Sequence, residues 1–383
     1  MLSLYLRSLP SVLADPGSDW LSQSQLQTYS RCPYSYYGSH ILALREKSEA
    51  KFDNLNAGNF LHHVMEQYLS RALDADNRIR PMEEDEIAVL ADKIICAYIQ
   101  ELCGDVSRNG RLLRLFDRLR QVSIMLIHSI QDELSDSSFR VVGLEWDTHG
   151  RRPGDPLPMS MTLPLEGDPA LSTAAQDNLP ESLPVQGDAV KLLMGGRIDR
   201  VDMYRAEDGE TVYIRVVDYK SSYHEFTVKS VTEDMNIQLL LYLFTLCSPH
   251  NRALFADAEG HVPKSVLPAS MVYVSPKEST REGALLPCRS GVVLEDPEIL
   301  QAVENTPHPE TTFLPSASRN KKGELTGKGL YSAGQMADLE GILRSAILDT
   351  AATMYDGCAH RTPSEEACRY CRVRGSCGVF TGD

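Results

Sequence analysis

The chain has 383 residues, of which 42% are hydrophobic and 24% are charged, so it can bury a sizeable core. Its net charge of −15 argues against a protein that coats nucleic acid, but it allows an enzyme with a local basic groove. The apolar run LLLYLF at 239–244 is far shorter than a membrane span, and we expect no membrane association. The first 20 residues lack the features of a signal peptide, which favours a cytoplasmic location.

The first third of the sequence predicts helices. A capped helix over 18–37 runs into Cys32 and Pro33, and residues 58–73 are strongly amphipathic. Apolar residues at spacings of three and four predict two more helices, over 82–103 and 110–135. Five arginines between residues 107 and 121 follow a helical pattern, which is typical of a solvated face and also compatible with a face that contacts phosphates.

From residue 139 onward the sequence becomes rich in β-branched residues. Four strands are predicted, over 139–146, 191–205, 211–220 and 269–276. Residues 148–188 are rich in proline, glycine and aspartate, and we expect a flexible excursion there. Helices are predicted over 233–246 and 332–357. This order of elements predicts an α/β body with helical additions.

Two motifs place carboxylates on neighbouring predicted strands, GGRIDRVD at 195–202 and VVDYKSS at 216–222. Asp218 and Lys220 are two residues apart, so both side chains point to one face of a strand, and Asp199 joins them if the strands pair. Two carboxylates and an ammonium group suit a hard divalent ion beside a nucleophilic water. The D-x-K spacing alone is weak evidence, because an exposed salt bridge has the same pattern.

Two residue pairs have the i, i+4 spacing that places both members on one helix face. They are His62 with Glu66, and Gln238 with Tyr242. Each pair by itself is typical of ordinary helix sequence. Their order along the chain with the Asp199 and D-x-K motifs is far more specific.

The sequence EEACRYCRVRGSC at 365–377 contains Cys368, Cys371 and Cys377 in the spacing C-x2-C-x5-C. In a reducing compartment such a cluster indicates a metal site rather than disulfides. Three thiolates do not complete a four-ligand site, so a further ligand is expected elsewhere.

Taken together, these motifs resemble the PD-(D/E)XK nuclease superfamily in its RecB-like branch. Within it, LSQSQLQTYSRCPYSYY and CRYCRVRGSCGVF resemble the C-terminal nuclease domain of AddB, the second subunit of AddAB helicase–nucleases. The resemblance covers residues 18–380 as a single domain. It implies a restriction-endonuclease-like core, a mixed sheet flanked by helices. The regions expected are a core at about 55–75 and 139–276, a helical insertion at 82–135, and a C-terminal helix with the cysteine cluster at 332–380.

The resemblance implies an exonuclease dependent on Mg2+ or Mn2+. It would hydrolyse single-stranded DNA from an unwound duplex during double-strand-break repair, beside an AddA-like helicase subunit, with contacts to the DNA backbone. Four groups match the metal ligands of the family: His62, Asp199, Asp218 and the main-chain carbonyl of Tyr219. Lys220 matches the catalytic lysine, and Gln238 and Tyr242 match the helix motif beside the site.

The resemblance also implies a 4Fe-4S cluster with one cysteine before the nuclease core and three after it. These are Cys32, Cys368, Cys371 and Cys377. Such a cluster would join the two ends of the domain and remove entropy from the unfolded chain. Cys358 is the alternative fourth ligand, which would give a local four-cysteine site more typical of zinc.

Two other functions remain open at this point. An exonuclease of CRISPR adaptation shares the one-plus-three cysteine pattern, but the chain length and the helices over 82–135 disfavour it. A non-catalytic module that holds DNA and docks a partner would keep the cluster for structure alone. The intact set of Asp199, Asp218 and Lys220 argues against this second alternative.

Overall fold

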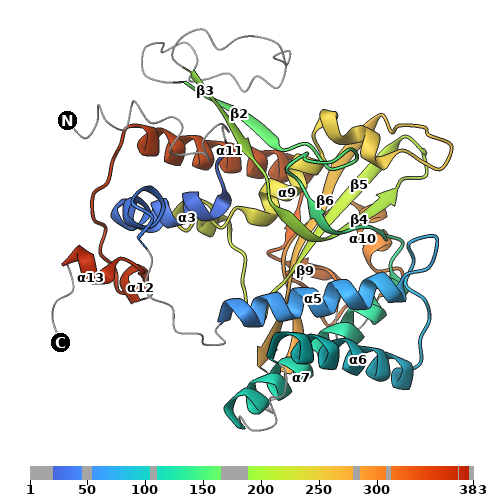
Figure 1. Cartoon of the computed structure of the whole chain (residues 1–383). Helices are drawn as coiled ribbons and strands as arrows, with labels where there is room; N and C mark the ends of the chain where they lie inside the picture. The colour runs from blue at the N-terminus through green and yellow to red at the C-terminus, as the bar shows by residue number, and fades with distance from the viewer. Residues whose placement is uncertain are drawn as a thin grey trace.

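A six-stranded mixed sheet forms the centre of the molecule, with the strand order β1–β4–β5–β6–β7–β10 (Figure 1). The computed structural model describes residues 20–44, 54–103, 110–164, 189–278, 285–307, 312–369 and 371–378. The strands of this sheet are β1 Arg140–Asp147, β4 Arg197–Arg205, β5 Thr211–Tyr219, β6 Ser265–Glu278, β7 Leu285–Leu294 and β10 Leu330–Tyr331. The predicted α/β class, a mixed sheet flanked by helices, is confirmed.

Strands β5 and β6 are parallel, and they are the pair around which the candidate site is built. Parallel neighbours need a crossover, which is made by α8 (Val228–Glu233), α9 (Gln238–Leu246) and the short 3-10 helix η2 (Pro249–Phe255). Strand β4 pairs antiparallel with both β1 and β5, and β7 pairs antiparallel with β6. The short strand β10 adds to β7 in parallel.

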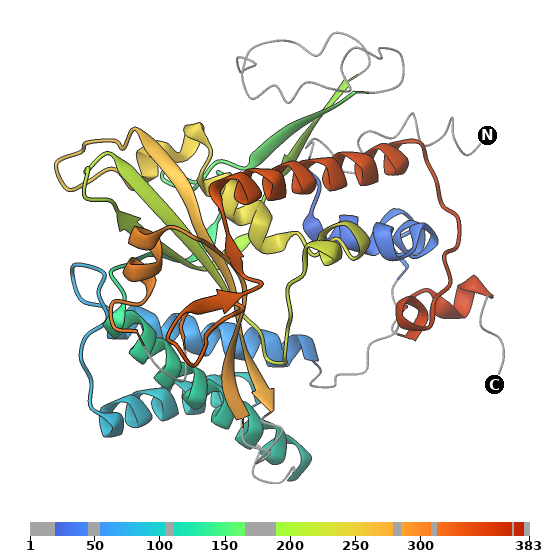
Figure 2. The same cartoon turned by 180° about the vertical axis from the view of Figure 1, so that it is seen from behind.

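Helices cover both faces of the sheet (Figures 1 and 2). One face carries α3 (Gln23–Arg31), α9 and α11 (Ala333–Tyr355). The other face carries α5 (Asn54–Ala72), α6 (Glu84–Cys103) and α7 (Gly110–Asp136). Alternation along β5 serves both cores, since Val216 is buried on the first face and Val217 on the second.

The helices predicted over 82–135 form a layer against the second face of the sheet. Apolar residues of α6 and α7 pack with α5 and with Val272 of β6 in one buried cluster. The sequence showed their amphipathic period, but period alone does not reveal which partner an apolar stripe covers. The predicted helix over 332–357 corresponds to α11.

The predicted strand over 191–205 is two strands. Strand β3 (Ala189–Met194) ends before Gly195 and Gly196, and β4 begins at Arg197. Both glycines lie in tight contacts, because a Cβ on Gly195 would lie 2.7 Å from the carbonyl oxygen of Thr148, and one on Gly196 would overlap the Tyr242 hydroxyl. The glycine pair therefore lets the chain leave one sheet and enter the other.

Part of the predicted flexible excursion over 148–188 is regular structure. Strand β2 (Met159–Pro164) pairs antiparallel with β3 in a separate two-stranded sheet. Its alternate residues Met159 and Met161 are buried in the main core, so it follows the ordinary period of a strand. Neighbouring prolines and glycines obscured that period in the sequence. Residues 165–188 lie outside the described part.

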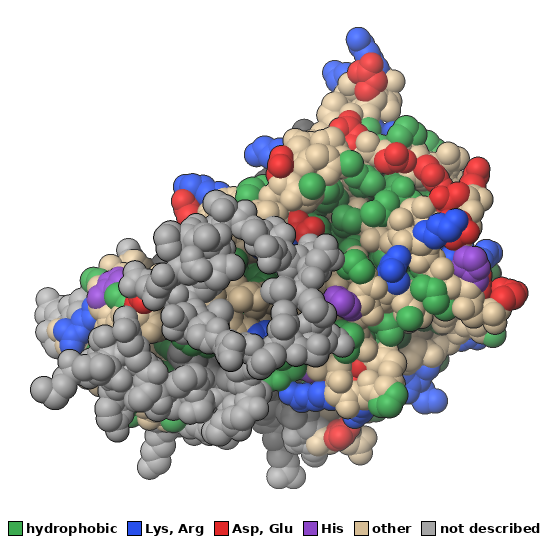
Figure 3. Space-filling view, turned by 90° about the horizontal axis from the view of Figure 1, so that it is seen from above, with side chains coloured by type: hydrophobic (Ala, Val, Ile, Leu, Met, Phe, Trp, Pro, Cys, Tyr) green, Lys and Arg blue, Asp and Glu red, His purple; other side chains and the backbone are tan. Residues whose placement is uncertain are grey.

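The remaining elements are short, and the sequence did not predict them individually. They are α4 Pro33–Tyr36, the π-helix η1 Tyr37–Ile41, α10 Pro297–Val303, β8 Ala317–Arg319, β9 Leu325–Gly327, α12 Glu365–Arg369 and α13 Arg374–Cys377. Strand β7 was also missed. Within the described residues, no helix has both the length and the hydropathy needed to cross a membrane. Seen from above, the described acidic and basic side chains are interspersed around an area of hydrophobic side chains (Figure 3).

Candidate functional site

Strand pairing brings the acidic residues and the lysine of the two motifs together. In the β4–β5 pair Arg200 lies opposite Val217, so Asp199 and Asp218 are close neighbours across the two strands. The main-chain N–H of Tyr219 donates a 2.9 Å hydrogen bond to Asp199 Oδ2. Lys220 Nζ lies 2.6 Å from Asp218 Oδ2. Because β4 and β5 pair, Asp199 lies beside Asp218 and Lys220, as the sequence predicts for paired strands.

His62 lies on α5, which packs against the second face of the sheet, and its side chain contacts Asp199. Its Nδ1 lies 2.9 Å from Asp199 Oδ1. Glu145 of β1 is the third member of a group in which His62, Glu145 and Asp199 offer ligand atoms within 4.8 Å of one another. A nitrogen and two carboxylate oxygens at this spacing are a suitable donor set for a divalent ion such as Mn2+ or Mg2+.

Sequence reasoning missed Glu145. It lies between Leu144, which pairs with Arg200, and Trp146, which pairs with Ile198, so it faces the position of Asp199. Its φ of 48° is unusual for a non-glycine residue and marks an irregular strand end. An acidic residue within the apolar strand that precedes the GGRIDRVD motif was the available signal.

Burial and mutual repulsion perturb the carboxyl groups. Burial, followed by the charge of Asp199, raises the pKa of Asp218 to about 6. The same two causes raise the pKa of Glu145 to about 6. Burial lowers the pKa of His62, but the hydrogen bond and the charge of Asp199 outweigh it, so the net shift is upward. A site with these shifts concentrates negative charge that a cation would stabilise.

Gln238 and Tyr242, the residue pair predicted on one helix face, both lie on α9. Gln238 Nε2 lies 3.5 Å from the Tyr242 hydroxyl, which fits against Gly196. Burial raises the pKa of Tyr242 to about 12, and the charges of Asp218 and Asp199 contribute. The Tyr242 hydroxyl therefore stays protonated near neutral pH and can donate a hydrogen bond.

The side chain of Tyr219 points to the opposite face of the sheet, and its hydroxyl accepts a 3.0 Å hydrogen bond from Arg200 Nη1. Its carbonyl belongs to the peptide that joins Tyr219 to Lys220, between the Asp218 and Lys220 side chains in sequence. Of the pair His62 and Glu66, only His62 is in the group of three ligand residues. Glu66 is half-buried and contributes to the raised pKa of Glu145.

A buried ionic network supports the strands from this opposite face, and sequence reasoning did not foresee it. Glu133 of α7 accepts a 2.6 Å hydrogen bond from Arg200 and a 2.7 Å bond from Arg289. Arg215 donates to Asp202 at 2.7 Å. These groups are almost fully buried, and they connect α7 with β4, β5 and β7. The network holds Arg200 in place directly beside Asp199.

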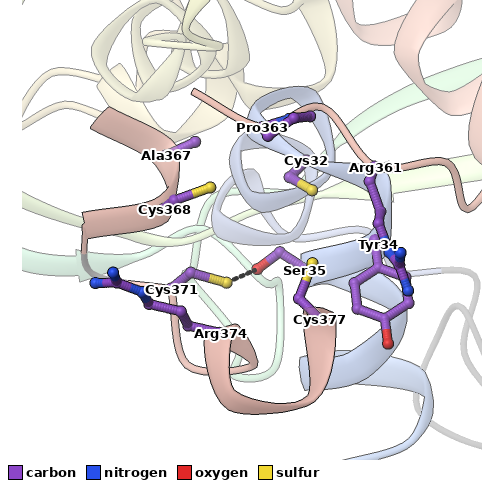
Figure 4. Close-up of a pocket in the computed structure, with 10 residues that line it drawn as sticks. All are labelled: Cys32, Tyr34, Ser35, Arg361, Pro363, Ala367, Cys368, Cys371, Arg374 and Cys377. Carbon is purple, nitrogen blue, oxygen red and sulfur yellow. Dashed lines mark hydrogen bonds between the residues drawn. The ribbon is translucent and has the colours of Figure 1, made fainter. Parts of the chain in front are cut away.

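The predicted cluster cysteines line one pocket. Cys32 comes from the turn between α3 and α4, and Cys368, Cys371 and Cys377 come from the segment that holds α12 and α13. Figure 4 shows these four side chains around a common space. The two ends of the domain meet here, as Tyr34 N–H donates to the carbonyl oxygen of His360 at 3.1 Å.

The environment of Cys32 favours its thiolate. Burial raises the pKa of this thiol, but hydrogen bonds from the backbone of Thr362 and Ser35 outweigh burial and lower the pKa. A lowered thiol pKa is typical of a metal ligand. Cys358, the alternative fourth ligand, lines a neighbouring pocket, where its Sγ lies 2.9 Å from His360 Nδ1.

Comparison with known proteins agrees with this geometry. The chain is similar to proteins named as one subunit, designated B, of an ATP-dependent helicase/deoxyribonuclease. They come from Thermoanaerobacter sp. strain X514 (25% identity), Ruminiclostridium cellulolyticum (23%) and Alkaliphilus oremlandii (24%). These matches cover 93–94% of this chain and 30% of each relative, so the chain spans less than a third of the length of these relatives. The family model of the PD-(D/E)XK nuclease superfamily matches residues 20–378, and the chain belongs to that superfamily.

Proposed function

We propose that the chain is a nuclease domain that hydrolyses phosphodiester bonds of DNA with the help of a divalent metal ion. The observation that carries this proposal is the convergence of Asp199, Asp218, Lys220 and His62 at the ends of β4 and β5. Membership of the nuclease superfamily supports it. We propose further that residues 18–380 act as one domain.

The donor set fits a hard divalent ion, Mg2+ or Mn2+. His62, Asp199, Asp218 and the main-chain carbonyl of Tyr219 would hold it, and Glu145 is a further ligand suggested by its position. A bound ion would polarise the phosphate and lower the pKa of a water molecule. The raised pKa of Asp218 and that of Glu145 support this assignment, because burial and the charge of Asp199 disfavour both carboxylates until a cation neutralises them.

Lys220 supplies a positive charge that the protein holds in place. Its Nζ is fixed against Asp218, and its main-chain N–H donates to the carbonyl oxygen of Val274 at 2.9 Å, which extends β5 by one residue. From this position the ammonium group would orient the attacking water or stabilise the negative charge that develops on the phosphate. Gln238 and Tyr242 would position the reacting groups beside Lys220.

For the substrate we propose single-stranded DNA from a duplex that a partner subunit unwinds. The support is the name of the relatives, which combines a helicase with a deoxyribonuclease. The chain would act as an exonuclease in double-strand-break repair in the cytoplasm, next to an AddA-like helicase. Its net charge of −15 predicts weak, salt-sensitive binding of DNA by the isolated chain.

For the cysteine pocket we propose a 4Fe-4S cluster held by Cys32, Cys368, Cys371 and Cys377. Thiolates are the usual ligands of such clusters, and these four side chains line one pocket. The lowered pKa of Cys32 supports its place among the ligands. The cluster would be structural, because it joins segments from the two ends of the described chain.

The proposed activity is tested by cleavage of end-labelled single-stranded DNA with Mg2+. We expect the wild type to cut and Lys220→Ala to lose at least about a hundredfold in rate, because the variant lacks the ammonium group that would orient the attacking water or stabilise the developing charge. Lys229→Ala is the matched control, since Lys229 is an exposed lysine on α8 with a surface ion pair to Glu233. Equal cutting by the wild type and Lys220→Ala would contradict the role of this lysine.

A further inference from the structure

One aromatic side chain stays exposed close to the candidate active site. Among the described residues, Tyr223 is the one aromatic member of the group of exposed large hydrophobic side chains, with 45% exposure. It follows Lys220 by three residues, on the segment that leaves the end of β5. Nearby rings such as those of Tyr219 and Tyr273 are 1% exposed, so the exposure of Tyr223 is specific to its position.

The segment that carries Tyr223 is fixed to the β6–β7 hairpin. The N–H of His224 donates to Ser275 Oγ at 3.4 Å, and the N–H of Phe226 donates to Ser290 Oγ at 2.8 Å. The Phe226 side chain is buried in the main core. Tyr223 therefore lies between two anchored segments. The hydrogen bonds of His224 and Phe226 follow it in the chain, and strand β5 precedes it.

A lysine and a leucine complete this exposed surface. Lys277 Nζ lies 4.9 Å from the centre of the Tyr223 ring, and Lys277 is itself exposed. Leu286, which lies opposite Lys277 in the β6–β7 pair, is 52% exposed. We refer to Tyr223, Lys277 and Leu286 as the Tyr223 platform. It combines an aromatic and apolar surface with the positive charge of Lys277, and at its edge the Tyr223 hydroxyl donates a 3.3 Å hydrogen bond to Glu225 Oε2.

The Tyr223 platform shares strand β6 with Tyr273, a residue beside the candidate active site. Lys220 Nζ lies 5.5 Å from the centre of the Tyr273 ring, and Lys277 is four residues further along the same strand. Residues an even number apart share a face, so Tyr273 and Lys277 point the same way, about 13 Å apart at about 3.3 Å per residue. Figures 1 and 2 show this end of the hairpin extending beside α7.

We propose that the Tyr223 platform binds a nucleotide of the substrate strand within a few nucleotides of the phosphate that is cut. The Tyr223 ring stacks on the base, and Lys277 contacts the phosphate backbone. Proteins that bind single strands without sequence preference use this combination of aromatic stacking and positive charge. The platform selects single strands, because the base faces of a duplex are already covered by stacking. The inference rests on the proposed nuclease function, since it positions the platform relative to the cut.

The test uses single-stranded oligonucleotides that each contain one 2-aminopurine, a base whose fluorescence falls when it stacks. Binding is measured in EDTA at low salt, where no metal-dependent cutting occurs. We expect the wild type to quench one position or two adjacent positions, and Tyr223→Ala to lose this quenching and about tenfold in affinity. Tyr223→Phe keeps the ring and should retain both. Leu267→Ala, an exposed residue near the other end of β6, is the control.

Failure of this inference differs from failure of the nuclease proposal. If the wild type cuts DNA in Mg2+ but Tyr223→Ala binds and quenches like the wild type, the platform has no such role. Absence of quenching by the wild type at every position overturns it as well. If neither the wild type nor Tyr223→Ala cuts DNA, but Tyr223→Ala loses the quenching that the wild type shows, the platform proposal stands and the nuclease proposal fails. Lys277→Gln should lower the salt slope of binding by about 0.7, since one phosphate contact is lost.

Discussion

Asp218 is a buried carboxyl group with a raised pKa. Its pKa in the folded chain, about 6, exceeds the value of about 3.9 expected in an unfolded chain. The folded state therefore binds its proton more tightly than the unfolded state does. It follows that the stability of the metal-free protein falls as pH rises from about 4 to about 6, and that the penalty persists at higher pH.

We predict that Asp218→Asn stabilises the metal-free protein. At about pH 7.5 the free energy of unfolding should rise by about 1–3 kcal/mol, because asparagine removes a buried charge that folding disfavours. Denaturant unfolding in EDTA measures this change. Asp132→Asn, an exposed residue of α7, is the control and should change stability little. A destabilised Asp218→Asn protein would contradict the argument.

The same variant separates stability from function. Asp218→Asn should gain less stability from added Mg2+ than the wild type does, since one proposed ligand has lost its charge. It should also lose cleavage activity. We therefore expect that a residue proposed as a metal ligand lowers the stability of the metal-free fold.

Among the elements, the strands that carry the candidate site are supported from the opposite face of the sheet by the ionic network around Glu133. Burial raises the pKa of Glu133, but the charges of Arg289, Arg200 and Arg215 outweigh burial and lower it well below its usual range. This carboxylate therefore contributes stability above its unfolded pKa of about 4.3, and the contribution is lost as pH falls below that value.

We predict that Glu133→Ala destabilises the protein by about 3–5 kcal/mol, because buried arginines lose a charged partner. Urea unfolding of Glu133→Ala beside Asp132→Ala, its exposed neighbour on α7, measures the difference. Equal stability of the two variants would show that the network has little energetic weight.

The sequence predicted elements well where one period runs without interruption. The predicted helices over 82–103 and 110–135 match α6 and α7 closely, and the predicted strand over 211–220 matches β5. Glycines broke the predicted strand over 191–205, because the contacts of Gly195 with Thr148 and of Gly196 with Tyr242 form only in the folded molecule. Strand β7 was missed because proline and cysteine interrupt its apolar pattern.

In the whole molecule, segments from opposite ends of the described chain pack together. Helices α3 and α4 lie beside α12 and α13 (Figures 1 and 2). Thr362 Oγ1 donates to the carbonyl oxygen of Arg31 at 2.9 Å, and the Tyr34 hydroxyl donates to the carbonyl oxygen of Ser376 at 3.4 Å. Both hydrogen bonds lie at the exposed surface, so a shared cluster would add a strong constraint to this junction.

We predict that anaerobically purified protein is brown, with broad absorbance near roughly 400 nm, and contains iron and sulfide. Cys32→Ala should lose the iron and destabilise the domain by several kcal/mol, on the order of a crosslink that closes a long loop. Cys358→Ala is the matched control and should keep the iron, because Cys358 lines a different pocket. Stoichiometric zinc without sulfide would contradict the cluster assignment.

The chemical groups of the two sites can be read from the sequence, because motif spacing fixes which residue types can share a strand or helix face. Alternation predicts that Asp218 and Lys220 share one face, and the local density of thiols in the C-x2-C-x5-C run predicts a metal site. Contacts between segments that are distant in the sequence are visible in the folded molecule alone. Packing between separate elements places Glu145 beside His62 and Asp199. It also places Glu133 beside its arginine partners and Cys32 beside the other three cysteines of the pocket. Such contacts leave no periodic trace in the sequence, since each partner is set by the fold as a whole.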